Sequence, residues 1–83
     1  MSRVREFIIE KLQREYSFKD GTDIDRINYV EEGYMDSLGL LQFIGEMEDE
    51  FGIEFTDEEL ESGSFRIVGE LIAMVERKLE ESR

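Results

Sequence analysis

The sequence contains no cysteine, histidine, proline or tryptophan. Without cysteine there are no disulfides, thiolate zinc sites or cysteine nucleophiles. Without histidine the commonest general base and metal ligand is missing. The chain has 83 residues, and a domain of this size buries only about 60–65% of its unfolded surface. These absences leave little means for catalysis, and we expect a protein that is not an enzyme.

Basic residues are scarce, with 10 Lys and Arg against 22 Asp and Glu and a net charge of −12. Nucleic acids and anionic membranes attract clustered Lys and Arg, so this balance argues against both as partners. It favours basic protein surfaces, approached by long-range steering that salt weakens. The alternative is that the acids only keep a small protein in solution.

Long apolar runs are also missing, and the N-terminal segment has no secretory pattern. We therefore expect no membrane insertion and a cytoplasmic location. The length predicts one domain over residues 1–83.

What the sequence does contain is helical periodicity. Apolar residues recur at helical spacing over residues 2–16, 37–51 and 65–80. A short helix is expected over 57–61, with Thr56 and Glu59 at capping-box spacing. Gly52 should end the second helix, and Ser64 is a candidate N-cap for the last. The expected fold is all-α, a small four-helix bundle with a long loop before its second helix and a short third helix.

The loop over residues 17–35 breaks the helical period but keeps apolar residues, so we expect it to be pinned to the core, with a helical turn near 25–29. Its acidic residues do not form an EF-hand, because Asn28 and Tyr34 fall where Gly and Glu are required. No dedicated metal site is expected, and loose binding of divalent ions by the clustered acids stays open.

The second helix has two apolar surfaces. At about 100° per residue, one arc of it points to the core and comprises Leu40, Phe43, Ile44, Met47 and Phe51. Leu38 and Leu41 lie on a flank beside Glu48 and Asp49. The flank is either a contact surface or a solvated acidic face with two exposed leucines.

Asp36 and Ser37 stand where this helix begins, and both are common N-cap residues. A serine nucleophile would need a base and an orienting group, and the chain has no histidine to supply the base. A phosphate on Ser37 would face unpaired backbone N–H groups and the positive end of the helix dipole. Capping and phosphate attachment therefore both remain open for Ser37.

The run GYMDSLGLLQFIGEMEDEFGIEFTDEEL, residues 33–60, resembles the acyl carrier proteins. The resemblance implies that Ser37 carries 4'-phosphopantetheine, which a phosphopantetheinyl transferase takes from coenzyme A and whose thiol holds acyl groups as thioesters. Further implied partners are acyl-loading or synthase enzymes of lipid or polyketide biosynthesis that have basic docking patches. The resemblance also implies that the carrier is a monomer. The implied docking residues are Asp36, Leu38, Leu41, Glu48 and Asp49. Residues that could line an acyl-chain space, or be plain core, are Phe43, Ile44, Met47, Phe55 and Ile72.

The sequence departs from the fatty-acid carriers at several positions. Gly39 and Gln42 replace acids two and five residues after the serine, Gly45 replaces a bulky apolar residue, and Met35 precedes the Asp where a small residue is common. These differences favour a stand-alone carrier of a specialised pathway. The alternatives are a carrier of aminoacyl groups, of the peptidyl or D-alanyl type, and an acidic interaction module in which Ser37 is only a cap.

Overall fold

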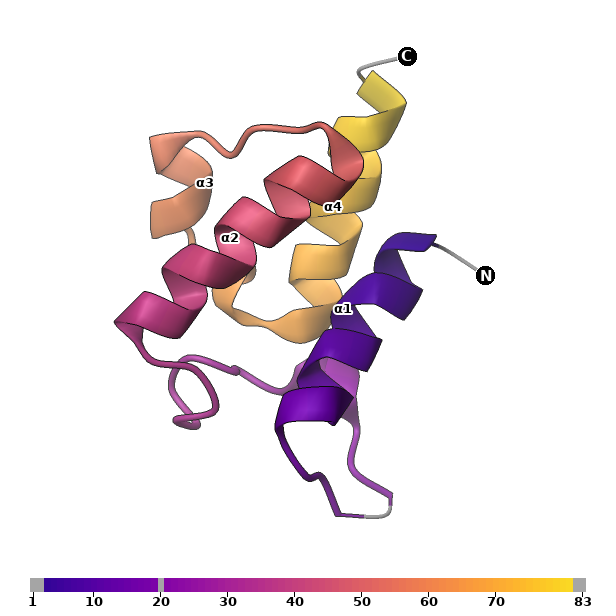
Figure 1. The fold of residues 1–83 in the computed structure, drawn as a ribbon, viewed down its shortest axis with the longest axis vertical. Helices are drawn as coiled ribbons and strands as arrows, with labels where there is room; N and C mark the ends of the chain where they lie inside the picture. The colour runs from indigo at the N-terminus through magenta and orange to yellow at the C-terminus, as the bar shows by residue number, and fades with distance from the viewer. Residues whose placement is uncertain (1–2, 20, 82–83) are drawn as a thin grey trace.

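The computed structural model describes residues 3–19 and 21–81, which form four α-helices and two short 3₁₀ turns (Figure 1). In chain order these are α1 (Arg3–Glu15), η1 (Ile24–Arg26), α2 (Ser37–Phe51), α3 (Asp57–Glu61), η2 (Gly63–Arg66) and α4 (Val68–Glu81). Within this part of the chain the one extended pairing is an isolated bridge between Asn28 and Ile67. The predicted all-α bundle with a short third helix is confirmed.

Helix α2 has the bounds that its sequence predicts. Asp36 is its N-cap, and its side chain accepts a hydrogen bond from the Gly39 N–H at 2.7 Å. Gly52 ends the helix in the left-handed conformation, with φ 65°, which costs glycine little because it has no Cβ. The capping box of α3 is also present, with Thr56 and Glu59 bonded reciprocally.

The start of α4 differs from the prediction. The helix begins at Val68 and not near residue 65, and Ser64 is not its N-cap. Residues 63–66 form η2, which Ser62 caps by accepting from the Ser64 N–H at 3.1 Å. Ile67 is then extended and pairs with Asn28. The apolar spacing in the sequence looks helical from residue 65 because Phe65 and Val68 are three residues apart and both are buried.

The long loop is anchored in the core through Tyr29, which is fully buried. Its hydroxyl donates to the Phe65 carbonyl at 2.7 Å, and its N–H donates to the Arg66 carbonyl at 3.1 Å. Burial raises the pKa of Tyr29, so its hydroxyl keeps its proton and remains a donor. The predicted pinning is confirmed, although the helical turn lies at 24–26.

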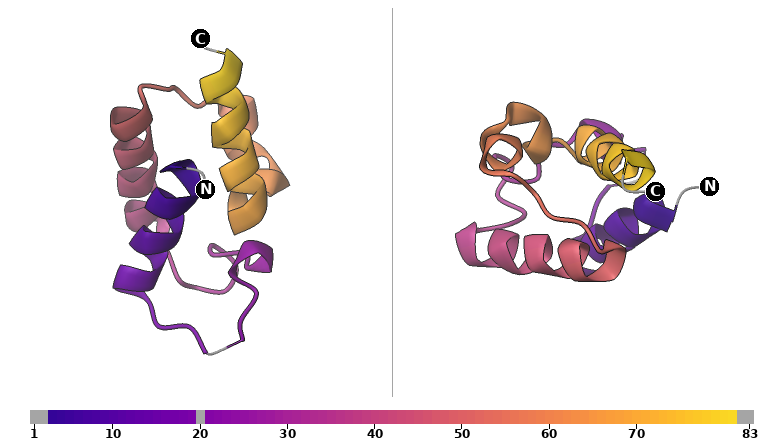
Figure 2. Two further views of the ribbon diagram at one scale, coloured as in Figure 1. Left: turned by 90° about the vertical axis from the view of Figure 1, so that its right-hand side faces the viewer. Right: turned by 90° about the horizontal axis from the view of Figure 1, so that it is seen from above.

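The helices surround one hydrophobic core. In the left view of Figure 2, α2 and α4 stand on opposite sides, α1 lies in front of the space between them, and the loop closes the lower end. The fully or almost fully buried side chains include Ile8, Leu12, Phe43, Met47, Phe65, Leu71 and Val75. Phe7 of α1 and Phe51 of α2 meet edge to face at 5.3 Å, and Lys11 pairs with Glu46 at 2.8 Å. The start of α2 therefore lies at one edge of a supported bundle, well away from both ends of the chain (Figure 1).

Among the described residues, no helix is both long enough and apolar enough to cross a bilayer.

Candidate functional site

Ser37 is the first residue of α2 and is exposed. Asp36 carries the N-cap hydrogen bond, so the capping role that the sequence left open between the two residues falls to Asp36. Within the described residues, no group is hydrogen-bonded to the Ser37 hydroxyl. Ser37 therefore presents a hydroxyl that the fold does not use.

The backbone around Ser37 suits an anionic group. The Gly39 N–H donates to the Asp36 side chain, and the Leu40 N–H donates to the Asp36 carbonyl. No described residue accepts from the N–H groups of Ser37 or Leu38. The first turn of α2 has no acidic side chain. A phosphodiester on Ser37 would thus meet free N–H donors and the positive end of the dipole, with Asp36 as the adjacent negative charge.

Gly39 has a local role in this geometry. A Cβ placed on it would lie 3.1 Å from the Asp36 Oδ1 atom and 3.3 Å from the Met35 Cγ atom. Both distances are tighter than ordinary van der Waals contacts, so a side chain at residue 39 would push against the cap. The glycine therefore lets Asp36 reach over the first turn.

Leu38 and Leu41 are exposed at 66% each, as their place on the flank predicts. Gly45 and Asp49 continue this stripe along α2 at helical spacing and are also exposed. Nothing lies within 4 Å of a Cβ built on Gly45. Beside it is a shallow hollow of about 460 Å³, lined by Gly45, Glu48, Asp49, Gly52, Ile53 and Glu54. The outer face of α2 thus has an apolar ridge near Ser37 and an acidic hollow farther along.

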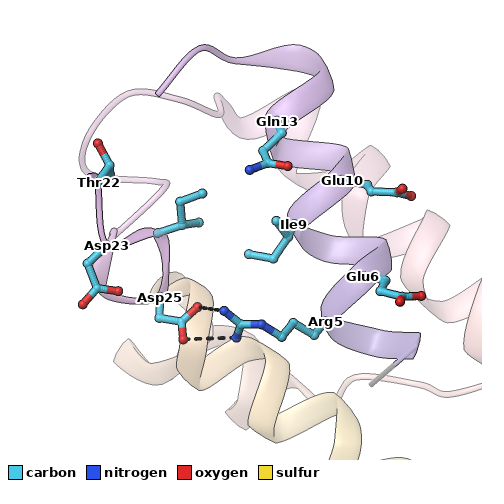
Figure 3. Close-up of a pocket in the computed structure, with 9 residues that line it drawn as sticks. Arg5, Glu6, Ile9, Glu10, Gln13, Thr22, Asp23 and Asp25 are labelled. Atoms are coloured by element: carbon cyan, nitrogen blue, oxygen red, sulfur yellow. Dashed lines mark hydrogen bonds and ion pairs between the residues drawn. The ribbon is translucent and has the colours of Figure 1, made fainter. Parts of the chain in front are cut away.

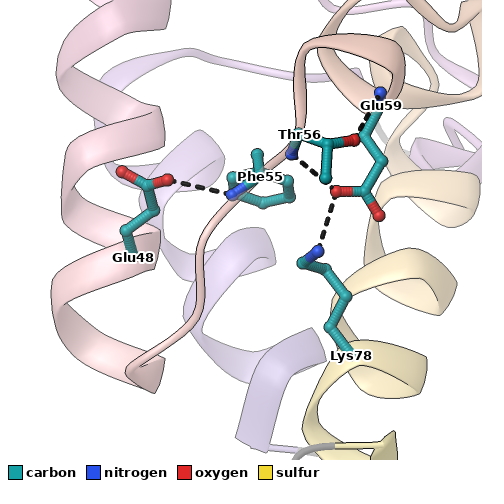
Figure 4. Close-up of polar contacts among 5 residues, drawn as sticks. All are labelled: Glu48, Phe55, Thr56, Glu59 and Lys78. Atoms are coloured by element: carbon teal, nitrogen blue, oxygen red, sulfur yellow. Dashed lines mark hydrogen bonds and ion pairs between the residues drawn. The ribbon is translucent and has the colours of Figure 1, made fainter.

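Glu48 differs from the other flank residues because it makes a hydrogen bond inside the protein. Its carboxylate accepts from the Phe55 N–H at 3.0 Å and so ties α2 to the segment before α3 (Figure 4). The Lys78 ammonium of α4 reaches Glu59 of α3 at 2.7 Å. Partial burial opposes ionisation of Glu59, but Lys78 and Thr56 outweigh it and hold the pKa of Glu59 below its usual value. Helix α3 is therefore fastened by Lys78 of α4, and the segment that leads into it by Glu48 of α2.

The five candidate acyl-lining residues come from α2, the segment before α3, and α4. Phe43, Met47, Phe55 and Ile72 are buried, and Ile44 is half-buried against them. They belong to the hydrophobic core, and none of them lines the hollow beside Gly45. Their packing fits the plain-core reading and leaves the acyl-lining role a prediction.

A second groove, of about 440 Å³, lies between α1 and the loop before α2. Figure 3 shows Arg5, Ile9 and Gln13 pointing from α1 toward the loop, with Arg5 and Asp25 joined across one end. The two Arg5–Asp25 distances are 2.9 and 3.1 Å. The lining comes entirely from α1 and the loop, so this groove is separate from the face that carries Ser37.

The sequence reading did not single out an aromatic cluster near Ser37. The rings of Tyr16 and Tyr34 lie 5.6 Å apart, and those of Phe18 and Tyr34 lie 5.1 Å apart. One sequence signal was present, since Tyr34 stands three residues before Ser37. Of the other two rings, Tyr16 directly follows the last residue of α1 and Phe18 lies at the start of the loop, and their approach depends on the tertiary fold.

A small helical bundle that exposes a serine hydroxyl at the start of a helix, directly after the N-cap Asp36, is compatible with a protein that carries a covalently attached group. Comparisons with known proteins identify the class further. The family profile described as "Phosphopantetheine attachment site" matches residues 2–75. The chain is 37% identical over 76 residues to the "Acyl carrier protein" of Streptococcus thermophilus (strain CNRZ 1066), an alignment that covers 92% of this chain and 90% of that protein. No solved structure matched the chain.

The chain belongs to the acyl carrier protein family of phosphopantetheine-bearing proteins. Its cofactor is a covalently attached 4'-phosphopantetheine. The family implies interaction with a phosphopantetheinyl transferase and with acyl-handling enzymes in general, and its members are generally not catalysts.

Proposed function

We propose that this protein holds acyl intermediates as thioesters on a 4'-phosphopantetheine arm attached to Ser37, and presents them to partner enzymes. The observation that carries this proposal is that capping and exposure of a hydroxyl fall to two different residues at the start of α2. Asp36 caps the helix by accepting from Gly39 at 2.7 Å, which leaves Ser37 exposed at the first helical position. Because Asp36 performs the capping, this arrangement supports a role for Ser37 other than that of a cap.

The attachment reaction is performed by a separate transferase. The Ser37 hydroxyl oxygen attacks the β-phosphorus of coenzyme A, the bond to the α-phosphate side breaks, and adenosine 3',5'-bisphosphate leaves. The hydroxyl proton passes to a base of the transferase, since this chain has no histidine. Ser37 N–H and Leu38 N–H are placed to stabilise the phosphodiester formed. When bound, the cofactor supplies the thiol that carries the cargo.

For docking, we propose the face formed by Asp36, Leu38, Leu41, Glu48 and Asp49. The two leucines are 66% exposed, and such an apolar ridge beside an acidic hollow suits a partner surface with an apolar pocket and basic residues. Glu48 contributes to this face through its charge, while one of its oxygens is bonded to Phe55 N–H. Binding to each partner should be weak and should fall with added salt, because exposed charges dominate the acidic part of the face.

The lack of an acid at Gly39 and Gln42, and of an apolar side chain at Gly45, supports a carrier of a specialised pathway. A partner that meets Leu38 and Leu41 can approach the backbone closely at Gly45, where no side chain intervenes. Carriage of aminoacyl groups is the alternative within the same family.

The proposal is tested by incubating the apo-protein with coenzyme A and a broad-specificity phosphopantetheinyl transferase and then measuring intact mass. We expect a gain of one phosphopantetheine, absent in Ser37→Ala and retained in Ser17→Ala, a matched change of an exposed serine elsewhere. Addition to the Ser37→Ala protein, or none to the wild type with several transferases, would contradict attachment at Ser37. Cargo on protein purified from its source then distinguishes acyl from aminoacyl carriage.

A further inference from the structure

Three aromatic rings form a cluster beside the start of α2. The Tyr34 ring contacts both Tyr16, at a centroid distance of 5.6 Å and an interplanar angle of 60°, and Phe18, at 5.1 Å and 50°. All three side chains are half-buried and pack against the edge of the core. Each of the three residues keeps part of its surface exposed, and we call the cluster the aromatic shelf (Tyr16, Phe18 and Tyr34).

The aromatic shelf lies close to Ser37. Tyr34 precedes it by three residues, and three trans peptide units separate their Cα atoms by at most about 11 Å. Asp36, which directly precedes Ser37, lies near enough to Tyr16 for its charge to act there. Burial raises the pKa of the Tyr16 phenol, and the charges of Glu15 and Asp36 raise it further.

The chemistry of the proposed arm matches such a surface. Its pantoyl part carries two geminal methyl groups, linked to the Ser37 oxygen only through phosphorus, an ester oxygen, a methylene and the quaternary carbon. These methyls are the first apolar groups along the arm, and aromatic faces are favourable partners for them. Because the arm is tethered, its effective concentration at the shelf is high, and a weak contact is enough to be populated.

The shelf also has unused polar groups. Within the described residues, nothing is hydrogen-bonded to the phenol hydroxyls of Tyr16 or Tyr34. Each can donate to or accept from the hydroxyl and amide groups that follow the geminal methyls along the arm. Pinning of the loop accounts for the ring–ring contacts, but it does not require the three residues to remain partly exposed.

Building on the proposed attachment at Ser37, we propose that the aromatic shelf binds the pantoyl part of the arm. The geminal methyls lie against Tyr34 and its neighbours, which biases the arm toward the loop side of α2 when no partner is bound. A partner that takes up the arm must then replace this contact. The shelf is thus a resting site for the arm, separate from the docking residues Leu38 and Leu41.

The test uses the holo-protein, verified by intact mass so that a failure of attachment is seen before the shelf is examined. Proton NMR of the wild type is expected to show upfield shifts of the geminal methyls relative to free phosphopantetheine, with nuclear Overhauser effects to Tyr34 ring protons. Methyl shifts equal to those of the free cofactor and no such effects, in fully loaded protein, would overturn the shelf and leave attachment at Ser37 intact.

Two substitutions test whether the geminal methyls contact the aromatic shelf specifically. Tyr34→Leu keeps an apolar side chain but removes the central ring, and should return the methyl shifts toward their free values. Phe7→Leu makes the matched change in the Phe7–Phe51 pair, which belongs to another part of the bundle, and should leave the shifts unchanged. Equal effects of both variants would refute a specific contact. The nuclear Overhauser effects in wild-type protein give an answer even if Tyr34→Leu is unstable.

Discussion

If Asp36 caps α2 and Ser37 only carries the arm, Asp36→Ala and Ser37→Ala should differ in their effects on stability. Asp36→Ala removes the side chain that accepts from Gly39 N–H at 2.7 Å. Loss of such an N-cap typically lowers the free energy of unfolding by about 1 kcal/mol. In a domain of this size, that corresponds to a fall in the melting temperature of roughly 4–8 °C.

Ser37→Ala should behave differently. Ser37 is exposed at the first helical position, and alanine has the higher helix propensity. The free energy of unfolding should therefore change by no more than about 0.5 kcal/mol. The same substitution should abolish phosphopantetheine loading, so the two variants separate stability from function.

Thermal unfolding followed by circular dichroism, on apo-proteins in one buffer, measures both effects. Asp36→Asn is the matched control, since asparagine also caps helices but lacks the charge, and it should retain most of the stability. If Ser37→Ala lowered the melting temperature as much as Asp36→Ala, the serine would be a cap after all, and the assignment of roles at this helix start would be wrong.

Further predictions concern glycine, pH, salt and cargo. Gly45→Ala should stabilise α2 by about 0.5–1 kcal/mol, because a Cβ there meets nothing, whereas Gly52→Ala should destabilise it because φ is 65°; opposite signs in thermal melts are the check. Glu59 has a pKa below its ordinary 4.5, so its stabilising effect is present above pH 4.5 and is lost as the pH falls through the lower folded value. Glu59→Gln should therefore flatten the acid side of the stability curve, and an unchanged slope would refute this. Added salt should raise the melting temperature, because it screens the net charge of −12; a constant value would rule out self-repulsion. If Phe43, Ile44, Met47, Phe55 and Ile72 shelter cargo, long-chain acyl forms should melt higher than short-chain forms, and equal melting temperatures would count against sheltering.

Helix α2 could be predicted to the residue because its two ends are fixed by local chemistry. Asp36 is a strong N-cap type, and Gly52 tolerates the left-handed conformation that ends a helix. The exposed leucines followed from the same local periodicity, since Leu38 and Leu41 lie outside the core arc. What the sequence could not decide was whether Asp36 or Ser37 caps the helix, because both side chains suit the task.

The start of α4 could not be predicted from local pattern. Ser64 precedes an apolar residue and is of a residue type that is common at N-caps. In the structure it lies inside the η2 turn, which Ser62 caps. The deciding contacts are distant in sequence: Ile67 pairs with Asn28, and the Phe65 carbonyl accepts from the Tyr29 hydroxyl. The aromatic shelf was missed for the same reason, because its rings come from both ends of the loop.

The buried Tyr29 has a consequence for how the chain can be lengthened. By fixing its middle to η2, Tyr29 divides the loop between α1 and α2 into two independently closed spans. Doubling a flexible span adds only about 0.6 kcal/mol of closure entropy, so the first span should accept a reporter peptide after the exposed turn residue Gly21. The same insertion beside Gly33 would enter the span that leads directly to Asp36. The second span is short and is held by bonds to the Asn28 and Val30 carbonyls, so added length should be tolerated better before Tyr29 than after it.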